Sequence, residues 1–271
     1  MVNLLKVNKN DKLFYHIYFN DNKEEIKNKY KINEEDKVTK IKIIIDYQVK
    51  SFKYLFSWCK CIESINFKKF YRNNIINMSY MFFDCSSLKE LNLNNFITNN
   101  VINMSYMFSW CKSLRELNLN NFITNNVSNM NDMFSLCKSL KTLNLNNFNT
   151  SNVIDMNNMF SKCLSLKELN LNNFNTNNVK DMSWMFNECS SLKELNLSNF
   201  NINNVIDMSR MFNKCSSLEE LNLNNCYTDN VTNMKCMFLG CSNELVKKIK
   251  IKYRNIREEA FDDEEYFKII N

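Results

Sequence analysis

A 26-residue repeat runs through most of this 271-residue chain and constrains its fold more than any other feature. Cysteine recurs at this spacing, a phenylalanine stands three residues before each cysteine, and methionine and leucine follow the same period. The recurring cysteines are Cys59, Cys85, Cys111, Cys137, Cys163, Cys189, Cys215 and Cys241. A fixed period of roughly 20 to 50 residues indicates a solenoid, in which equivalent side chains of successive units line up in inward rows.

The first half of each unit has the spacing of a short α-helix. In one unit, Met104, Met107, Phe108 and Cys111 fall at i, i+3, i+4 and i+7, which is one face of a helix. The residue before the first methionine is Asn or Asp, and the first unit has Ser51 at the equivalent position. Each of these side chains can accept a hydrogen bond from the first turn, so we expect this column to cap the helices.

The second half of each unit predicts a short strand followed by a polar turn. Leu117 and Leu119 alternate with Asn118, so the leucines face inward and the asparagine outward. We expect the outward asparagines to form an amide ladder along the stack. A lone unit buries too little apolar surface to offset the entropy of ordering it, whereas stacked units cover one another.

The repeat divides the chain into a central array and two caps. Residues 51–242 hold eight repeats, residues 1–50 form an N-terminal cap, and residues 243–271 form a C-terminal cap. The segments 12–19 and 38–45 predict strands in the N-terminal cap. In the C-terminal cap, 244–253 predicts a last strand and 256–270 a short amphipathic helix.

Glycine and proline are nearly missing, with one Gly and no Pro, so asparagine must take the turn positions with positive φ. The repeated cysteines predict an inward column of packed thiols, with disulfides or a metal site as the alternatives. Three further cysteines lie outside this column, and the total of eleven is odd. They are Cys61, Cys226 and Cys236, and Cys226 takes a position that is Phe in other units.

The recurring pattern NNV-x-x-M-x-x-MF-x-x-C-x-SL-x-x-LNL-x-x-F resembles the BspA-type leucine-rich repeat, also called the DUF285 repeat, over residues 52 to about 245. The family often has Gly before the cysteine, and here only Gly240 does. The resemblance implies an α/β solenoid. It would be a right-handed superhelix like that of a leucine-rich repeat, with one parallel β-sheet face and short helices on the opposite face. It also implies surface adhesion for some members, which carry an export signal and an anchor that this sequence does not show.

Two outward columns on the predicted helices carry aromatic residues in the N-terminal half and charged residues in the C-terminal half. Exposed aromatic clusters mark binding sites, so we expect a partner-binding surface here. The alternative is that the rings only pack against neighbouring coils. The candidate residues are Tyr54, Trp58, Tyr80, Phe83, Tyr106, Trp110 and Trp184.

Two other columns are weaker candidates. An acidic ridge beside the outward asparagines could hold cations or a basic partner; it consists of Glu90, Glu116, Glu168, Glu194 and Glu220. A threonine column, interrupted by Ile202, could match ice or another crystalline surface; it consists of Thr98, Thr124, Thr150, Thr176 and Thr228.

The sequence offers little for catalysis, because it has one histidine, His16, and shows no nucleophile, phosphate-loop, dinucleotide or zinc-protease motif. The net charge of +6 comes with mixed signs and no basic stripe of the kind that nucleic acids need. We expect no enzyme activity, cofactor or metal, no nucleic acid partner and no membrane span. The predicted function is a monomeric, cytoplasmic protein-interaction scaffold. The alternative is a surface or secreted adhesion module.

Overall fold

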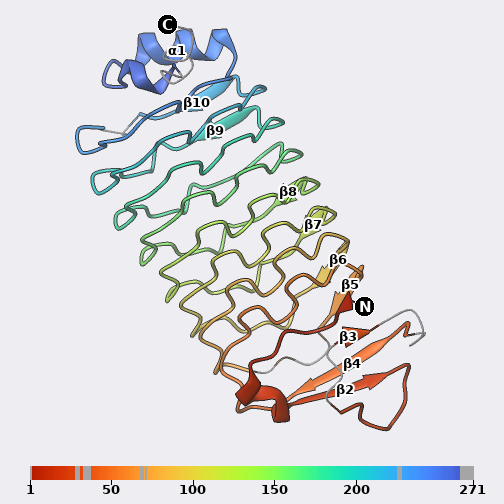
Figure 1. Cartoon of the computed structure of the whole chain (residues 1–271). Helices are drawn as coiled ribbons and strands as arrows, with labels where there is room; N and C mark the ends of the chain where they lie inside the picture. The colour runs from red at the N-terminus through yellow and green to blue at the C-terminus, as the bar shows by residue number, and fades with distance from the viewer. Residues whose placement is uncertain are drawn as a thin grey trace, which may run out of the picture.

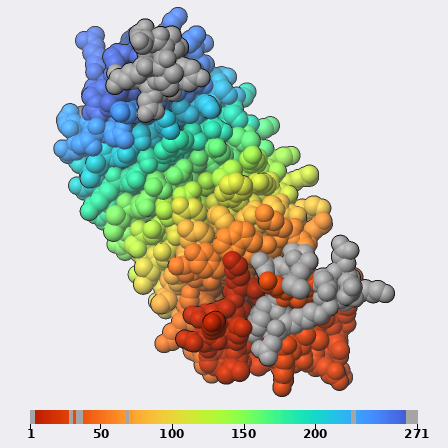
Figure 2. Space-filling model, in the orientation of Figure 1, coloured from red at the N-terminus to blue at the C-terminus, as the bar shows by residue number. Residues whose placement is uncertain are grey.

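The computed structural model describes residues 2–27, 31–32, 38–67, 70, 72–224 and 228–262. The chain winds through successive coils that stack along one axis, with a cap at each end (Figure 1). Figure 2 shows the same body in space-filling form, where the coils follow one another in sequence order from the N-terminal to the C-terminal end.

Equivalent side chains of successive coils lie directly over one another, as the repeat predicts. The rings of Phe134 and Phe160 have centroids 5.7 Å apart and planes 5° apart, and Cys137 is fully buried. This phenylalanine row continues without a break from Phe56 to Phe238 and ends on Phe261 of the C-terminal cap. The coil-over-coil alignment on which the solenoid depends is therefore present.

The predicted sheet face consists of short parallel pairs. The central leucines of the strands from β6 onward are buried and the flanking residues face outward, as the alternation predicts. In-register pairing joins β5 (Ser64–Asn66) to β6 (Glu90–Asn92), β7 (Glu116–Leu117) to β8 (Thr142–Leu143), and β9 (Glu194–Asn196) to β10 (Glu220–Asn222). These pairs do not join into one continuous sheet across the described residues.

The predicted helices are wrong: the Met-x-x-Met-Phe-x-x-Cys segments are runs of tight turns. In the coil that starts at Met78, the N–H groups of Met81 and Cys85 close turns onto the carbonyls three residues earlier. The alternate N–H groups, such as those of Tyr80 and Phe82, donate to carbonyls of the next coil. Every second donor therefore joins coils, which an α-helix cannot do because it bonds its N–H groups internally.

These turn runs place two residues per coil in the left-handed region. The first column begins with Tyr54 and Tyr80, the second begins with Trp58 and ends at Gly240, and all have φ between 50° and 80°. Such values suit glycine, and they cost other residues about 1–2 kcal/mol each.

The prediction that asparagine takes the positive-φ positions is wrong: Asn158 is the one asparagine in the two columns, which otherwise carry residues such as Tyr54, Lys162 and Arg210. Gly240 stands before Cys241, at the position where the family often has glycine, and it is the one residue of these columns whose type indicates positive φ.

The expected helix caps are links of a second parallel ladder. Asn103 forms isolated bridges with Asn77 on one side and Asn129 on the other, and the row extends from Ser51 to Asn233. The Asn103 side chain accepts from the N–H of Ser105 at 2.9 Å, which is an Asx turn at the start of the turn run.

The outward asparagines of the strand face also close local turns instead of forming the predicted ladder. Asn118 Oδ1 accepts from the N–H of Asn120 at 3.1 Å, and its Nδ2 donates to Asn94 of the preceding coil at 3.3 Å.

The threonine column is buried, so it cannot match ice or another surface. Thr124 is 0% exposed; its Oγ1 donates to the carbonyl of Asn149 at 2.8 Å and accepts from the N–H of the same residue at 2.8 Å. Thr98 makes the same pair of bonds to Ile123. Thr150 does so with Asn175, so these three threonines tie their coils to the next through both backbone groups of one residue. Thr176 and Thr228 donate to the carbonyls of Asn201 and Asn255.

The repeated cysteines are free and pack inward, as the packing interpretation predicts. From Cys85 onward, each Sγ lies within hydrogen-bond distance of a phenylalanine carbonyl in the preceding coil, as Cys137 does with Phe108 at 3.1 Å. Burial raises the pKa of Cys137 to about 12. Cys61 is exposed and Cys236 is buried, while Cys226 lies outside the described residues.

The described part of the N-terminal cap contains two antiparallel strand pairs and a 3-10 helix. β1 (Val2–Asn3) pairs with β3 (Lys31–Ile32), β2 (Tyr15–Phe19) pairs with β4 (Ile41–Ile45), and η1 spans Lys9–Phe14. β2 and β4 lie within the two predicted strand segments. The carbonyl of Leu4 accepts from Cys59 Sγ at 3.1 Å, and the backbone N–H of Lys6 donates to the carbonyl of Leu55 at 2.8 Å. This segment therefore bonds to the first coil as a preceding coil would.

The C-terminal cap begins with α1 (Asn243–Lys252), where the sequence predicted a strand. The Ser242 side chain caps this helix, and Leu245 and Ile249 are its buried residues. Of the predicted helix at 256–270, the structure describes residues to 262 and shows only η3 (Glu258–Ala260).

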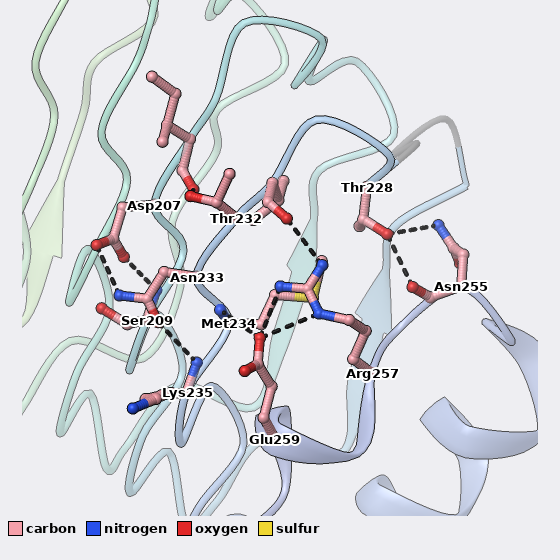
Figure 3. A network of polar contacts seen from close by, with 12 residues as sticks. Asp207, Ser209, Thr228, Thr232, Asn233, Met234, Lys235, Asn255, Arg257 and Glu259 are labelled. Carbon is pink, nitrogen blue, oxygen red and sulfur yellow. Dashed lines mark hydrogen bonds and ion pairs between the residues drawn. The ribbon is translucent and has the colours of Figure 1, made fainter.

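Polar contacts fix this cap to the last coil (Figure 3). Arg257 donates to the carbonyl of Val231 at 2.8 Å and pairs with Glu259 at 2.6 Å. Glu259 in turn accepts from the N–H of Met234 at 3.1 Å.

Candidate functional site

Five of the predicted aromatic residues form one continuous cluster on the turn-run face of the first three coils. The rings of Tyr80 and Tyr106 are stacked at 4.4 Å with planes 7° apart, and Tyr54 lies 4.8 Å from Tyr80 on the other side. Phe83 contacts Trp58 edge-on at 5.4 Å and Tyr80 at 5.4 Å. These rings are half-buried, so they pack on one another and still leave part of their surface to solvent.

The backbone explains why the rings meet. Tyr54, Tyr80 and Tyr106 occupy one left-handed column, with φ values of 65°, 59° and 57°. Each has its N–H bonded to the next coil, so the three side chains leave equivalent backbone positions and stack on one another. The sequence predicted these columns from their spacing, but it assigned them to helices.

The two remaining aromatic candidates differ in position. Trp110 is 37% exposed and occupies the same column as Trp58, with the buried Asp84 in the coil between them. Trp184 lies three coils beyond Tyr106 in the tyrosine column. The Arg210 guanidinium lies over its ring, 4.6 Å from the centroid. We define the aromatic cluster as Tyr54, Trp58, Tyr80, Phe83, Tyr106 and Trp110, which leaves Trp184 outside it.

The tyrosine row ends on a half-buried carboxyl group. Asp132 follows Tyr106 in the same column and is hydrogen-bonded to the Tyr106 and Ser135 side chains. Burial raises the pKa of Asp132 to about 6, although these two hydrogen bonds lower it. Burial and the neighbouring Asp132 raise the pKa of Tyr106 as well. This hydroxyl therefore stays protonated and can donate a hydrogen bond at physiological pH.

A cavity of about 400 Å³ opens between the N-terminal cap and the first coil, at the edge of the aromatic cluster. Tyr54 and Trp58 line it from the coil, and Lys6 and Asp11 line it from the cap. Lys6 Nζ lies 3.4 Å from the centroid of the Trp58 ring. Burial lowers the pKa of Lys6.

The acidic ridge lies on the strand face and is exposed along its length. Register pairs Glu220 with Glu194 in neighbouring strands, while Thr142 interrupts the row beside Glu116. A groove of about 590 Å³ runs over the C-terminal part of the ridge, lined by Glu168, Glu194 and Glu220, with Lys252 of α1 also lining it. Glu220 pairs with Lys248 at 2.7 Å, and this hydrogen bond lowers the pKa of Glu220.

The single histidine ties the N-terminal cap together. His16, on β2, lies 3.3 Å from Asp46 and 3.2 Å from Glu25. Hydrogen bonds to these two carboxylates raise its pKa. Among the residues that the structure describes, no three histidine, cysteine or acidic side chains are placed to share a metal ion. In the same residues, no helix combines the length and apolarity needed to cross a bilayer.

Comparison with solved structures finds leucine-rich repeat proteins. A leucine-rich repeat protein from Bacteroides ovatus is 18% identical over 76% of this chain and 54% of its own, with a TM-score of 0.41. This chain thus spans about half the length of that protein. The T. pallidum leucine-rich repeat protein is 17% identical over 78% of this chain and 79% of its own, with a TM-score of 0.38. No curated protein matches the sequence.

A family model extends over most of the chain. The model described as "Mycoplasma protein of unknown function, DUF285" matches residues 50–170 and 137–251. The two matches together span 50–251, which is 202 of the 271 residues and contains the whole repeat array. The resemblance inferred from the repeat is confirmed, and the chain belongs to the DUF285 family of BspA-type leucine-rich repeat proteins.

Proposed function

We propose that this protein is a non-enzymatic scaffold that binds a protein partner through the aromatic cluster. The observation that carries the proposal is a row of six aromatic side chains, half-buried or exposed, on one face of the first three coils. Tyrosine and tryptophan supply much of the binding energy at protein interfaces, because they bury large areas with few rotatable bonds.

The geometry of the rings favours a protein partner over a carbohydrate. Tyr80 and Tyr106 cover each other's faces at 4.4 Å, so ring edges and hydroxyl groups remain for contacts. A sugar ring needs an open aromatic face, whereas a protein surface can meet edges and hydrogen-bond donors together. The cluster is also held in place by inter-coil bonds, so binding orders few side chains.

Affinity capture from the native source tests the proposal with a double variant, Trp58→Asn and Trp110→Asn. Both residues have positive φ, 61° and 66°, and asparagine tolerates this region better than most residues. The backbone should therefore keep its path while two rings are lost. We expect partner capture to fall at least tenfold, with a melting temperature within about 4 °C of the unmodified chain, from a stability change of roughly 1 kcal/mol.

The matched control is Trp184→Asn, which removes a tryptophan at another left-handed position with φ of 59°, three coils away. This variant should capture the partner as the unmodified chain does. Equal capture by all three proteins, or equal loss in both variants, would show that the aromatic cluster does not form the binding surface.

The groove on the strand face is a second surface on which this scaffold could bind. The groove has a volume of about 590 Å³, and its glutamates make the lining acidic. Such a lining suits a basic segment of a partner. Changing Glu168 and Glu194 to glutamine removes two charges and keeps the shape. Loss of capture in this variant, with capture intact in Trp58→Asn/Trp110→Asn, would assign the function to the strand face.

A further inference from the structure

Three lysine ammonium groups lie over rings of the aromatic cluster. Lys6 Nζ is 3.4 Å from the centroid of Trp58, Lys112 Nζ is 4.4 Å from that of Trp110, and Lys53 Nζ is 5.2 Å from that of Tyr54. One of these lysines comes from the N-terminal cap and two come from the coils, so separate parts of the chain bring positive charge to the same cluster.

These three lysines have no carboxylate partner among the ion pairs of the described residues. Two acidic groups near the cluster, Asp84 and Asp132, are occupied in other ways. Asp84 pairs with Lys60 at 2.8 Å, and Asp132 is hydrogen-bonded to Tyr106 and Ser135. The cluster therefore carries uncompensated positive charge around an apolar centre.

The cavity beside the cap concentrates this charge. Lys6 and Lys53 both line it, together with one carboxyl group, Asp11, and Tyr54 and Trp58 of the cluster also line it. Burial lowers the pKa of Lys6, which an anion bound in this cavity would oppose. A volume of about 400 Å³ accommodates one or two side chains of a bound peptide.

We propose that the aromatic cluster binds an acidic segment of the partner protein, in which carboxylate side chains flank an aromatic or aliphatic residue. The carboxylates pair with Lys6, Lys53 and Lys112, and the apolar residue enters the cavity against Trp58. This inference rests on the proposed function and specifies the chemistry of its partner. Charge complementarity selects the acidic segment, and the ring edges supply the apolar contact.

Single-stranded nucleic acid also carries negative charge, but the cluster fits it poorly. Bases bind aromatic side chains by stacking on open ring faces. Here Tyr80 is covered by Tyr54 on one side and Tyr106 on the other, and Lys6 lies over Trp58. A peptide needs no open ring face, since its carboxylates meet the lysines and its apolar side chain meets ring edges.

The test uses fluorescence anisotropy with four labelled 15-residue peptides and oligouridylate as probes. The peptides alternate glutamate with phenylalanine, glutamine with phenylalanine, lysine with phenylalanine, and glutamate with serine. We expect the glutamate–phenylalanine peptide to bind at least tenfold more tightly than the other three peptides and oligouridylate. Its affinity should fall as salt is raised from 50 to 300 mM, since salt screens the lysine–carboxylate pairs.

Charge-reversed variants locate the binding. Lys6→Glu, Lys53→Glu and Lys112→Glu combined should weaken binding of the acidic peptide at least tenfold, and the corresponding glutamine variant should do so to a smaller degree. The matched control combines Lys141→Glu, Lys167→Glu and Lys193→Glu, which makes the same change in net charge on exposed residues of the strand face. The control should bind the acidic peptide at least as tightly as the variant with glutamine at positions 6, 53 and 112 does.

Each other result overturns the inference. Equal binding of the glutamate and glutamine peptides would remove the role of charge, although capture by the aromatic cluster could still succeed. Tighter binding of oligouridylate or of the glutamate–serine peptide would show a plain electrostatic surface. Binding of no peptide, or equal weakening by both lysine triples, would also refute it.

Discussion

Lys162 occupies one of the left-handed backbone positions, with φ of 61°, and its N–H donates to Asn187 in the next coil at 2.7 Å. A Cβ at this φ costs about 1–2 kcal/mol, because it crowds the following carbonyl. Glycine has no Cβ, but it loses about 0.5–1 kcal/mol more backbone entropy on folding than alanine does. The difference leaves Lys162→Gly more stable than Lys162→Ala by about 0.5–1 kcal/mol.

The difference in the free energy of unfolding between the glycine and alanine variants isolates the contribution of the backbone conformation. Both variants lose the 3.6 Å ion pair between Lys162 and Glu188, a partly exposed contact worth roughly 0–1 kcal/mol. The reference site is Lys167, which is exposed and does not have positive φ. There the order should reverse, with alanine more stable than glycine by about 0.5–1 kcal/mol.

Urea denaturation followed by circular dichroism measures all four variants. We expect the Gly–Ala difference to change sign between positions 162 and 167. The reciprocal change, Gly240→Ala, should destabilise the chain, since φ there is 77° and a Cβ would lie 3.3 Å from the Lys214 Cα. If Lys162→Ala is as stable as Lys162→Gly, or more stable, the left-handed turn run and its cost are refuted.

Three further predictions test the core. Thr124→Val should destabilise the chain by about 2–4 kcal/mol in urea denaturation, because it leaves both backbone groups of Asn149 without their partner; Thr124→Ser keeps the hydroxyl and should cost less. In the folded protein, an alkylating reagent should modify the exposed Cys61 well before the buried Cys137, as peptide mass spectrometry would show; equal rates would place the thiol column at the surface. Burial raises the pKa of Asp132 to about 6, above roughly 4 for an unfolded aspartate, so the folded chain retains this proton over that window. The stability that comes from protonated Asp132 is therefore present below about pH 4 and is lost as pH rises to 6. Asp132→Asn should remove about 1–3 kcal/mol of this pH dependence.

The stacking was predictable because it depends on periodicity alone. Any 26-residue coil that buries Phe134 and Cys137 must place them next to their counterparts, whatever the local backbone does. The buried phenylalanine row and the burial of the leucines on the strand face follow from that register. The same argument located the aromatic columns, since they share the period.

The turn runs were missed because their inward residues have helical spacing. Residues such as Met104, Met107, Phe108 and Cys111 are buried in a turn run just as they would be on a helix. The distinguishing signal is the left-handed column, which carries tyrosine, tryptophan and lysine where glycine would have identified it. One residue, Gly240, preserved that signal at the last coil.

The cap at the C-terminus was mispredicted for a different reason. The segment around Leu245 and Ile249 alternates lysine with isoleucine, which resembles a strand pattern. It folds as α1 because Ser242 caps a helix start and the two buried residues lie four apart, on one helical face.

The contact between the Lys6 ammonium and the Trp58 ring could not be predicted, because it joins a residue of the N-terminal cap to a coil more than fifty positions away.

Each internal coil presents to its successor, along the turn run, the same backbone donors and acceptors that it receives from its predecessor. A whole 26-residue unit inserted between two coils would thus find the backbone partners of its turn run, and its removal would leave none of these unmatched. Gene segments of this length can be duplicated or deleted without a search for new contacts, so the chain is free to lengthen or shorten in steps of one turn while its ends stay the same.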